Sequence, residues 1–166
     1  MPLFRLFERR ARVLGMCAAL AVTISCGPTL HPGGDARAAA DAIRQQIARY
    51  TAALDAADTT LASQVWRTTS DVSVIHPAGH AHGWEDVKQL YASFGSTFSE
   101  RTLTARDVSI HVSGDAAWVE FYWHFVGKQR KDGSMMQTDG RETQIYNRSG
   151  DQWQLVHVHY SGPPAR

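Results

Sequence analysis

Apolar residues recur with two different periods along the chain, and the period changes near residue 100. Spacings of three and four predict amphipathic helices over residues 36–57 and 84–98. Their apolar stripes comprise Ile43, Ile47, Tyr50 and Leu54 in the first helix and Val87, Leu90, Tyr91, Phe94 and Phe98 in the second. Between them, Thr59 or Thr60 can cap a short helix. Residues 71–76 then alternate like a short strand that ends before Pro77.

From Arg101 onward the period is two, which predicts β-strands. Four strands are predicted at residues 103–112, 116–129, 135–148 and 152–160. Tight turns join them at Ser113-Gly114-Asp115, Lys131-Asp132-Gly133 and Ser149-Gly150-Asp151. Helices followed by an antiparallel meander predict an α+β fold, with the helices gathered on one face of the sheet.

The first 25 residues have the composition of an export signal. A basic leader precedes the apolar run 13–24, which is too short to span a bilayer comfortably. Ser25 before Cys26 resembles a bacterial lipobox, although Thr23 stands where Leu is preferred. We predict a signal peptide over 1–25, a flexible tether over 26–35 and one domain over 36–166. Plain secretion, a retained anchor or a buried helix are the alternatives.

If this prediction holds, the mature protein lies in the bacterial cell envelope on the periplasmic side. A lipid on Cys26 would be its membrane contact, and no disulfide would remain in the domain. Four arginines and one glutamate belong to the leader. Without them, 13 basic and 15 acidic side chains remain, a net charge of −2. The domain therefore lacks the basic surface that nucleic-acid binding needs.

The C-terminal strands carry the most specific motifs of the chain. These are Asp115-Ala116-Ala117, Glu142-Thr143, Trp153-Gln154-x-Val156-His157-x-His159 and Ser161-Gly162-x-Pro164. With the order of elements, they resemble the nuclear transport factor 2-like superfamily, which includes ketosteroid isomerases and SnoaL-like polyketide cyclases. The nearest likeness is to the association domain of calcium/calmodulin-dependent protein kinase II. The resemblance implies a cone-shaped fold in which a bent sheet wraps a helix around a pocket and dimerises through its outer face.

Strand alternation and this resemblance together sort the residues onto two faces of the sheet. The pocket is expected to be lined by Trp66, Phe121, Trp123, Phe125, Gln144, Val158 and Tyr160. The outer, dimer-forming face is expected to contain Trp118, Tyr122, His124, His157 and His159. The association domain that the chain resembles has arginines at the positions that match Trp123, Gln144 and Tyr160 here. An apolar or aromatic ligand is therefore expected rather than a carboxylate.

Two residues are candidates for proton chemistry at the expected pocket. His76 ends the first predicted strand and could serve as a general acid or base, because imidazole titrates near neutral pH. Tyr50 could donate a hydrogen bond to a developing oxyanion. In the alternative interpretation, His76 caps a strand and Tyr50 belongs to the core. Asp71 and Glu142 are possible acidic partners that could equally be solvated.

The spacing of several histidines also raises the question of a metal. His80 and His82 could share a strand face near His76, and His157 and His159 could meet a metal at a dimer seam. Zinc requires three or four converging ligands, and no cysteine lies near either group. We therefore predict neither a metal nor a cofactor. The chain also has no phosphate-binding glycine loop, nucleophile elbow or dinucleotide fingerprint.

Two functions remain open at this point. The first is an exported module that binds an apolar or aromatic small molecule and forms a homodimer without catalysis. The second is a cofactor-free isomerase or cyclase that uses His76 as the acid/base group, with Tyr50 and Tyr160 as hydrogen-bond donors. The fold alone does not choose between them, because one fold carries many functions.

Overall fold

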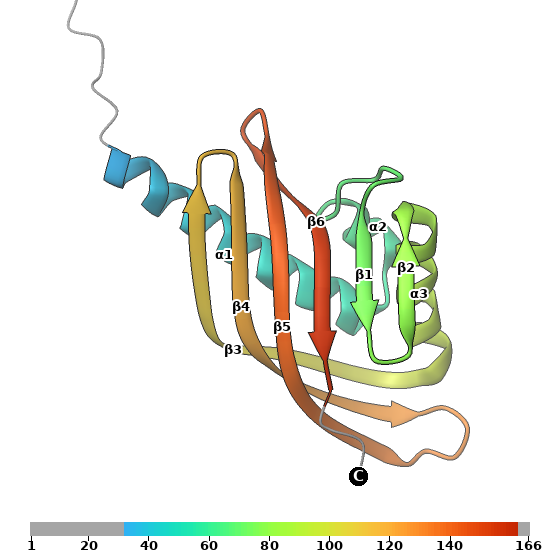
Figure 1. Cartoon of the computed structure of the whole chain (residues 1–166). Helices are drawn as coiled ribbons and strands as arrows, with labels where there is room; N and C mark the ends of the chain where they lie inside the picture. Colours follow the sequence, from blue (N-terminus) through green and yellow to red (C-terminus); the bar gives the residue numbers. More distant parts are fainter. Residues whose placement is uncertain (1–31, 163–166) are drawn as a thin grey trace, which may run out of the picture.

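The computed structural model describes residues 32–162 of the 166-residue chain (Figure 1). The predicted signal peptide, Cys26 and most of the predicted tether lie outside the described residues. The helices are α1 (Pro32–Ala56), α2 (Thr59–Ser63) and α3 (Gly83–Thr97). The strands are β1 (Ser73–His76), β2 (Gly79–His82), β3 (Phe98–Ser113), β4 (Ala116–Gln129), β5 (Met135–Ser149) and β6 (Gln152–Ser161).

The strands form one six-stranded sheet in the order β2-β1-β6-β5-β4-β3. All neighbours are antiparallel except β1 and β6, which run parallel. Figure 1 shows that β3, β4 and β5 are strongly curved and that α1 crosses one face of the sheet. This curved, unclosed sheet with N-terminal helices confirms the predicted α+β, nuclear transport factor 2-like fold. No helix within residues 32–162 is both long and apolar enough to cross a membrane.

Several element boundaries differ from the sequence prediction. Helix α1 begins at Pro32, so it enters the predicted tether. The N-cap of α2 is Asp58, whose Oδ1 accepts the N–H groups of Thr60 and Leu61 at 2.7 and 3.1 Å. A carboxylate accepts both free amides at once, which explains why it takes the capping position. Strand β3 begins at Phe98, because the buried Phe98 ring packs between Phe94 and Phe125.

Arg101 joins the C-terminal ends of α1 and α3 to the sheet. Its guanidinium donates hydrogen bonds to the carbonyl groups of Leu54 and Asp55 in α1 and of Phe94 in α3. The Oδ1 atom of Asp55 in turn accepts the N–H of Leu103 at 2.7 Å. A cation at two helix C-termini complements the negative end of each helix dipole, although the Leu54 and Phe94 carbonyls also accept the backbone N–H groups of Ala57 and Phe98. These bonds fix the distance between the helices and the concave face of the sheet.

A glycine in β5 allows the backbone to pack directly against a tryptophan of β4. A Cβ atom at Gly140 would lie 1.9 Å from the Ser161 carbonyl oxygen and 2.4 Å from Cζ2 of Trp123. No side chain fits at those distances, so the position requires glycine. The Trp123 indole lies across β5 here, and its Nε1 donates to the Arg141 carbonyl at 3.3 Å. Trp123 is thereby held on the concave face, 6 % exposed.

Candidate functional site

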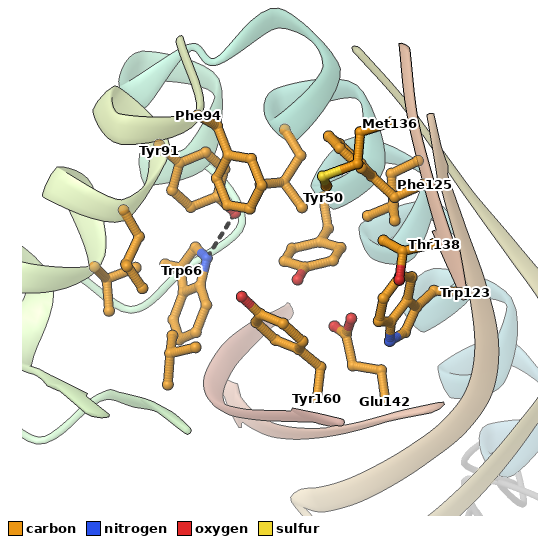
Figure 2. A pocket seen from close by; sticks show the side chains of 15 residues that line it. Tyr50, Trp66, Tyr91, Phe94, Trp123, Phe125, Met136, Thr138, Glu142 and Tyr160 are labelled. Carbon is orange, nitrogen blue, oxygen red and sulfur yellow. Dashed lines mark hydrogen bonds between the residues drawn. The ribbon is translucent and has the colours of Figure 1, made fainter. Parts of the chain in front are cut away.

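A cavity of about 170 Å³ lies between the concave face of the sheet and helices α1 and α3 (Figure 2). The helices contribute Tyr50, Leu54, Leu90, Tyr91 and Phe94. The sheet contributes Trp123, Phe125, Met136, Thr138, Glu142 and Tyr160. Leu90, Phe94, Met136, Thr138 and Tyr160 are half-buried. Nearly all of the wall is aromatic or aliphatic, so the few polar groups in it determine its chemistry.

The structure places the sequence-predicted pocket residues at two depths. Four of the seven residues predicted for the pocket line the cavity, namely Trp66, Trp123, Phe125 and Tyr160, and the catalytic candidate Tyr50 lines it as well. Phe121, Gln144 and Val158 lie on the same face of the sheet but do not line it. They are 2 %, 0 % and 0 % exposed, because core side chains fill the space above them. Alternation along a strand indicates the face on which a residue lies but not its depth.

His76 lies beside the cavity rather than in its wall. Its half-buried ring stacks against Tyr160, with 6.0 Å between the ring centroids and 17° between the planes. Tyr160 lines the cavity and His76 does not. Of the two predicted candidates for proton chemistry, the structure therefore brings Tyr50 to the cavity and leaves His76 next to it.

Among residues 32–162, Glu142 is the one that brings a carboxyl group to the cavity wall. The residue is 4 % exposed, and burial raises the pKa of its carboxyl from 4.5 to about 7. Hydrogen bonds from Gln144 and Tyr50 act in the opposite direction and lower this pKa, because they stabilise the carboxylate. Figure 2 shows the Glu142 carboxyl and the hydroxyl groups of Tyr50 and Tyr160 directed into the same space. The cavity thus combines a mainly apolar wall with one carboxyl group and, directed toward it, the hydroxyl groups of Tyr50 and Tyr160.

The tyrosines at the cavity are neutral hydrogen-bonding groups. Burial raises the pKa of Tyr160 to about 12 and that of Tyr50 well above its usual value, with the Glu142 charge adding to both. The Tyr91 hydroxyl accepts the Nε1–H of Trp66 at 3.0 Å and keeps its own proton as a donor. Tyr50 and Tyr160 are the hydroxyl groups directed toward Glu142 (Figure 2).

The alternation of β5 indicates that Glu142 lies on the concave face, although its residue type argues against burial. Glu142 stands two residues before Gln144, so the alternation that assigns Gln144 to the concave face assigns Glu142 there as well. Carboxylates are rarely fully buried, so the sequence leaves a solvated position for Glu142 equally open. Asp71, the other acidic candidate, is exposed and pairs with Arg67 at 2.6 Å.

The opposite face of the sheet carries the five residues predicted for a dimer contact. Trp118 and Tyr122 are each 45 % exposed, and Ile145 is 37 % exposed beside them. His124 Nδ1 lies 2.9 Å from Asp139 Oδ1, and Arg106 contacts the same oxygen. His157 is half-buried and its Nδ1 lies 2.8 Å from Ser73 Oγ, whereas His159 is exposed.

The histidines of β2 and β6 share this outer face through the ladder of β1. Ser73 pairs with both His82 and His157, and Ile75 pairs with both His80 and His159. The rings of His80 and His82 are in contact, with centroids 3.7 Å apart. Within residues 32–162, no three His, Cys, Asp or Glu side chains converge in a way that could hold a metal ion.

Comparison with known proteins gives a consistent result. Residues 43–166 match the SnoaL-like domain family. A nuclear transport factor 2-like superfamily protein from Salmonella enterica serovar Typhimurium is 42 % identical, with a TM-score of 0.71 over 74 % of this chain and 89 % of that one. No curated protein matches the sequence.

Two more distant structures share the fold. A candidate dehydratase of the same superfamily from Streptomyces avermitilis is 21 % identical, with a TM-score of 0.69 over 78 % of this chain and 99 % of its own. The type 3 hexachlorocyclohexane dehydrochlorinase from Novosphingobium barchaimii is 14 % identical, with a TM-score of 0.69 over 77 % and 88 %.

Proposed function

Because the chain belongs to the SnoaL-like domain family of the nuclear transport factor 2-like superfamily, we propose that its cavity binds a small, uncharged, mainly apolar molecule. The observation that carries this proposal is an aromatic-walled space of about 170 Å³ with three polar groups at one place. Ligand sites are mostly apolar, with a few polar groups that fix orientation. A protein cavity of about 150 Å³ accommodates benzene. A single six-membered ring with a small polar substituent therefore matches the site.

Binding can be tested with single-ring probes and two threonines of β5. Thr138 lines the cavity, whereas Thr143 lies on the outer face opposite Glu120. We expect phenol and cyclohexanone to bind in ligand-observed NMR, and benzoate to bind more weakly because its charge would be buried beside Glu142. Thr138→Phe should fill the cavity and abolish binding, whereas Thr143→Phe should not. Equal binding by both variants would contradict the assignment of the cavity.

Glu142 favours a second function, acid/base catalysis on the bound molecule. A carboxyl with a pKa of about 7 is divided between its acid and base forms near neutral pH, where proton transfer is most effective. We propose that Glu142, rather than His76, exchanges the proton while Tyr50 or Tyr160 donates a hydrogen bond to a substrate oxygen. The fold is shared with proteins named as a dehydratase and a dehydrochlorinase, which supports this at the level of the fold alone.

Proton abstraction can be measured without knowing the natural substrate. In D₂O, exchange of the α-protons of cyclohexanone reports a base that acts beside a carbonyl group. We expect the protein to accelerate this exchange, Glu142→Gln to reduce it to the background rate, and His76→Gln to leave it largely unchanged. Loss of exchange in His76→Gln but not in Glu142→Gln would return the catalytic role to His76. Binding without any exchange would leave the binding function alone.

We further propose that the outer face forms a homodimer. The exposed Trp118, Tyr122 and Ile145 side chains are adjacent across β4 and β5, and grouped apolar surface of this kind marks association sites. Tyr122→Asp places a charge at the centre of this surface and should yield monomers in light scattering. A control substitution at an exposed residue of the same face, Glu120→Gln, should keep the oligomeric state. A dimer that survives Tyr122→Asp would contradict this interface.

Export and lipid attachment are proposals that rest on residues 1–26 of the sequence. Expression of the full chain in a bacterium should place the protein in the membrane fraction of the envelope. Cys26→Ser should release it from that fraction. A wild-type protein recovered as an unmodified soluble periplasmic species would instead support plain secretion.

A further inference from the structure

A chain of buried polar groups extends from Glu142 away from the cavity. Strand β5 places Glu142, Gln144 and Tyr146 on the concave face at alternate positions, and the last two are 0 % exposed. The Gln144 Nε2 atom donates to Glu142 Oε1 at 2.8 Å. The Tyr146 hydroxyl donates to Gln144 Oε1 at 2.6 Å. Neither Gln144 nor Tyr146 lines the cavity, so their polar groups serve each other and Glu142.

The hydroxyl of Tyr146 determines which way the Gln144 amide is oriented in this row of hydrogen bonds. A phenol carries one proton, and Gln144 Oε1 is the one acceptor recorded for it among the described residues. If the Gln144 amide were reversed, its NH₂ group would face Tyr146 and the phenol proton would lose that acceptor. A buried donor without a partner is unfavourable. The amide therefore keeps its oxygen toward Tyr146 and its NH₂ group toward Glu142.

We propose that Gln144 and Tyr146 are positioning residues that hold Oε1 of Glu142 as a permanent hydrogen-bond acceptor and so direct its titrating proton to Oε2, which remains for the cavity. Oε1 faces an N–H donor in both protonation states and cannot itself donate in that direction. The acidic proton then lies on the oxygen that is free to meet Tyr50 and a ligand.

The use of a proton held on Oε2 rests on the proposed acid/base catalysis by Glu142. When Glu142 acts as the base, the bond from the substrate to its proton breaks, its electron pair stays on the substrate, and a new O–H bond forms at Oε2. The carboxylate becomes a neutral acid. Return of that proton to another atom of the substrate restores the carboxylate, so no further reactant is needed. The chain of hydrogen bonds behind Oε1 carries no proton away in this scheme.

The proton affinity of Glu142 can be measured without any ligand, by ¹³C NMR of protein labelled at glutamate carboxyl carbons. The Glu142 signal is identified by its absence in Glu142→Gln. Methionine has nearly the same length as glutamine but does not donate a hydrogen bond. In Gln144→Met, the Glu142 carboxyl should therefore bind its proton at least about tenfold more tightly, with the titration midpoint about one pH unit higher. Tyr146→Phe frees the Gln144 amide to reverse when Glu142 is protonated, and should move the midpoint in the same direction by less. Gln137→Met, at an exposed position of the same strand, is the matched control and should have no effect.

An unchanged Glu142 midpoint in folded Gln144→Met, with native near-ultraviolet circular dichroism, would overturn the proposal. If Gln144→Met does not fold, Tyr146→Phe decides in the same way, because it preserves the core volume. A shifted midpoint in a protein that shows no exchange of cyclohexanone protons would support the positioning chain and reject the proposed catalysis. Exchange by the wild type with an unchanged midpoint in both variants would do the reverse.

Discussion

Strand β4 presents a tryptophan to each side of the sheet, and the two residues have different surroundings. Trp123 is 6 % exposed and donates a hydrogen bond to the Arg141 carbonyl. Trp118 is 45 % exposed and stacks on His111, with ring centroids 4.9 Å apart. The strand and the residue type are the same, so the difference comes from the helices that cover the concave face. The surroundings of Trp123 are therefore determined within this chain, whereas Trp118 on the outer face is left exposed.

Charge is distributed just as unevenly between the two faces. The inner face contains the buried carboxyl of Glu142, enclosed by aromatic rings. On the outer face, Asp139 contacts Arg106 and His124, and its side chain is 62 % exposed. Exposed ion pairs contribute little to stability, whereas a buried charge has a large effect. The two faces should consequently respond very differently to matched substitutions.

Truncation of the two tryptophans should give the largest contrast. Trp123→Ala removes a buried side chain from the cavity wall and should lower the free energy of unfolding by about 3–5 kcal/mol. Trp118→Ala should lower it by less than about 1 kcal/mol when the protein is monomeric. Urea unfolding followed by far-ultraviolet circular dichroism compares both variants with the wild type.

A different outcome at Trp118 would also be informative. If Trp118→Ala is as destabilising as Trp123→Ala and the loss depends on protein concentration, the outer tryptophan is covered by a second copy in solution. A large loss that does not depend on concentration would contradict the distinction between the faces.

Neutralising one glutamate on each face should give the next largest contrast. A pKa raised from 4.5 to about 7 means that the fold prefers neutral Glu142, so this group destabilises the protein progressively as the pH rises from 4.5 through 7. Above pH 7 the penalty is about 3 kcal/mol. Glu142→Gln should remove it and raise the free energy of unfolding at pH 8, with little change at pH 4.5. Glu120→Gln, exposed on the outer face, should leave the pH dependence unchanged.

Urea unfolding at pH 4.5, 6 and 8 tests this prediction. Stabilisation at pH 8 with simultaneous loss of proton exchange would fit a functional group retained at the expense of stability. A Glu142→Gln variant that is less stable than the wild type at pH 8 would show that the carboxylate is favourable where it lies.

The same comparison shows how far the sequence predicts this molecule. Alternation along β4 separates Trp123 and Phe125 from Trp118 and Tyr122, because each strand residue has one of two faces, and in the structure the first two line the cavity while the other two are exposed. The position of a residue along the face depends on where the helices lie, which no local pattern contains. Phe121 therefore lies in the filled core and Phe125 at the cavity, although both belong to the same alternating set.

Irregularities of the ladder limit the prediction in a second way. The register shifts between Arg106 and Ser109, where Asp107 has a φ of 55°, and again between Ile145 and Tyr146. A bulge inserts a residue and reverses the assignment of faces beyond it. The burial of Glu142 escapes sequence analysis for another reason. It depends on the contact with Tyr50 of α1 and on the Gln144 amide. The local sequence of β5, which mixes polar and charged residues, does not indicate these contacts.

The smallest expected effect concerns a histidine on the outer face and has the opposite sign to that of Glu142. Burial lowers the pKa of His157 below 6.5, and the neighbouring His159 and His80 lower it further. The unfolded chain therefore binds a proton more readily, and this group destabilises the fold as the pH falls below 6.5. His157→Gln should reduce the loss of stability between pH 7 and pH 5. The change should stay under about 1 kcal/mol, because water screens a half-exposed ring.

The effect is best measured in the Glu142→Gln background, which removes the opposing titration on the inner face. Urea midpoints at pH 5 and 7 should differ less in the double variant than in Glu142→Gln alone. His111→Gln provides a control, since His111 is exposed on the same face and lies outside the group formed by His80, His157 and His159. If His157→Gln leaves the midpoint difference unaltered, the acid sensitivity of the protein arises elsewhere, and the outer face contributes to stability through its aromatic residues rather than its histidines.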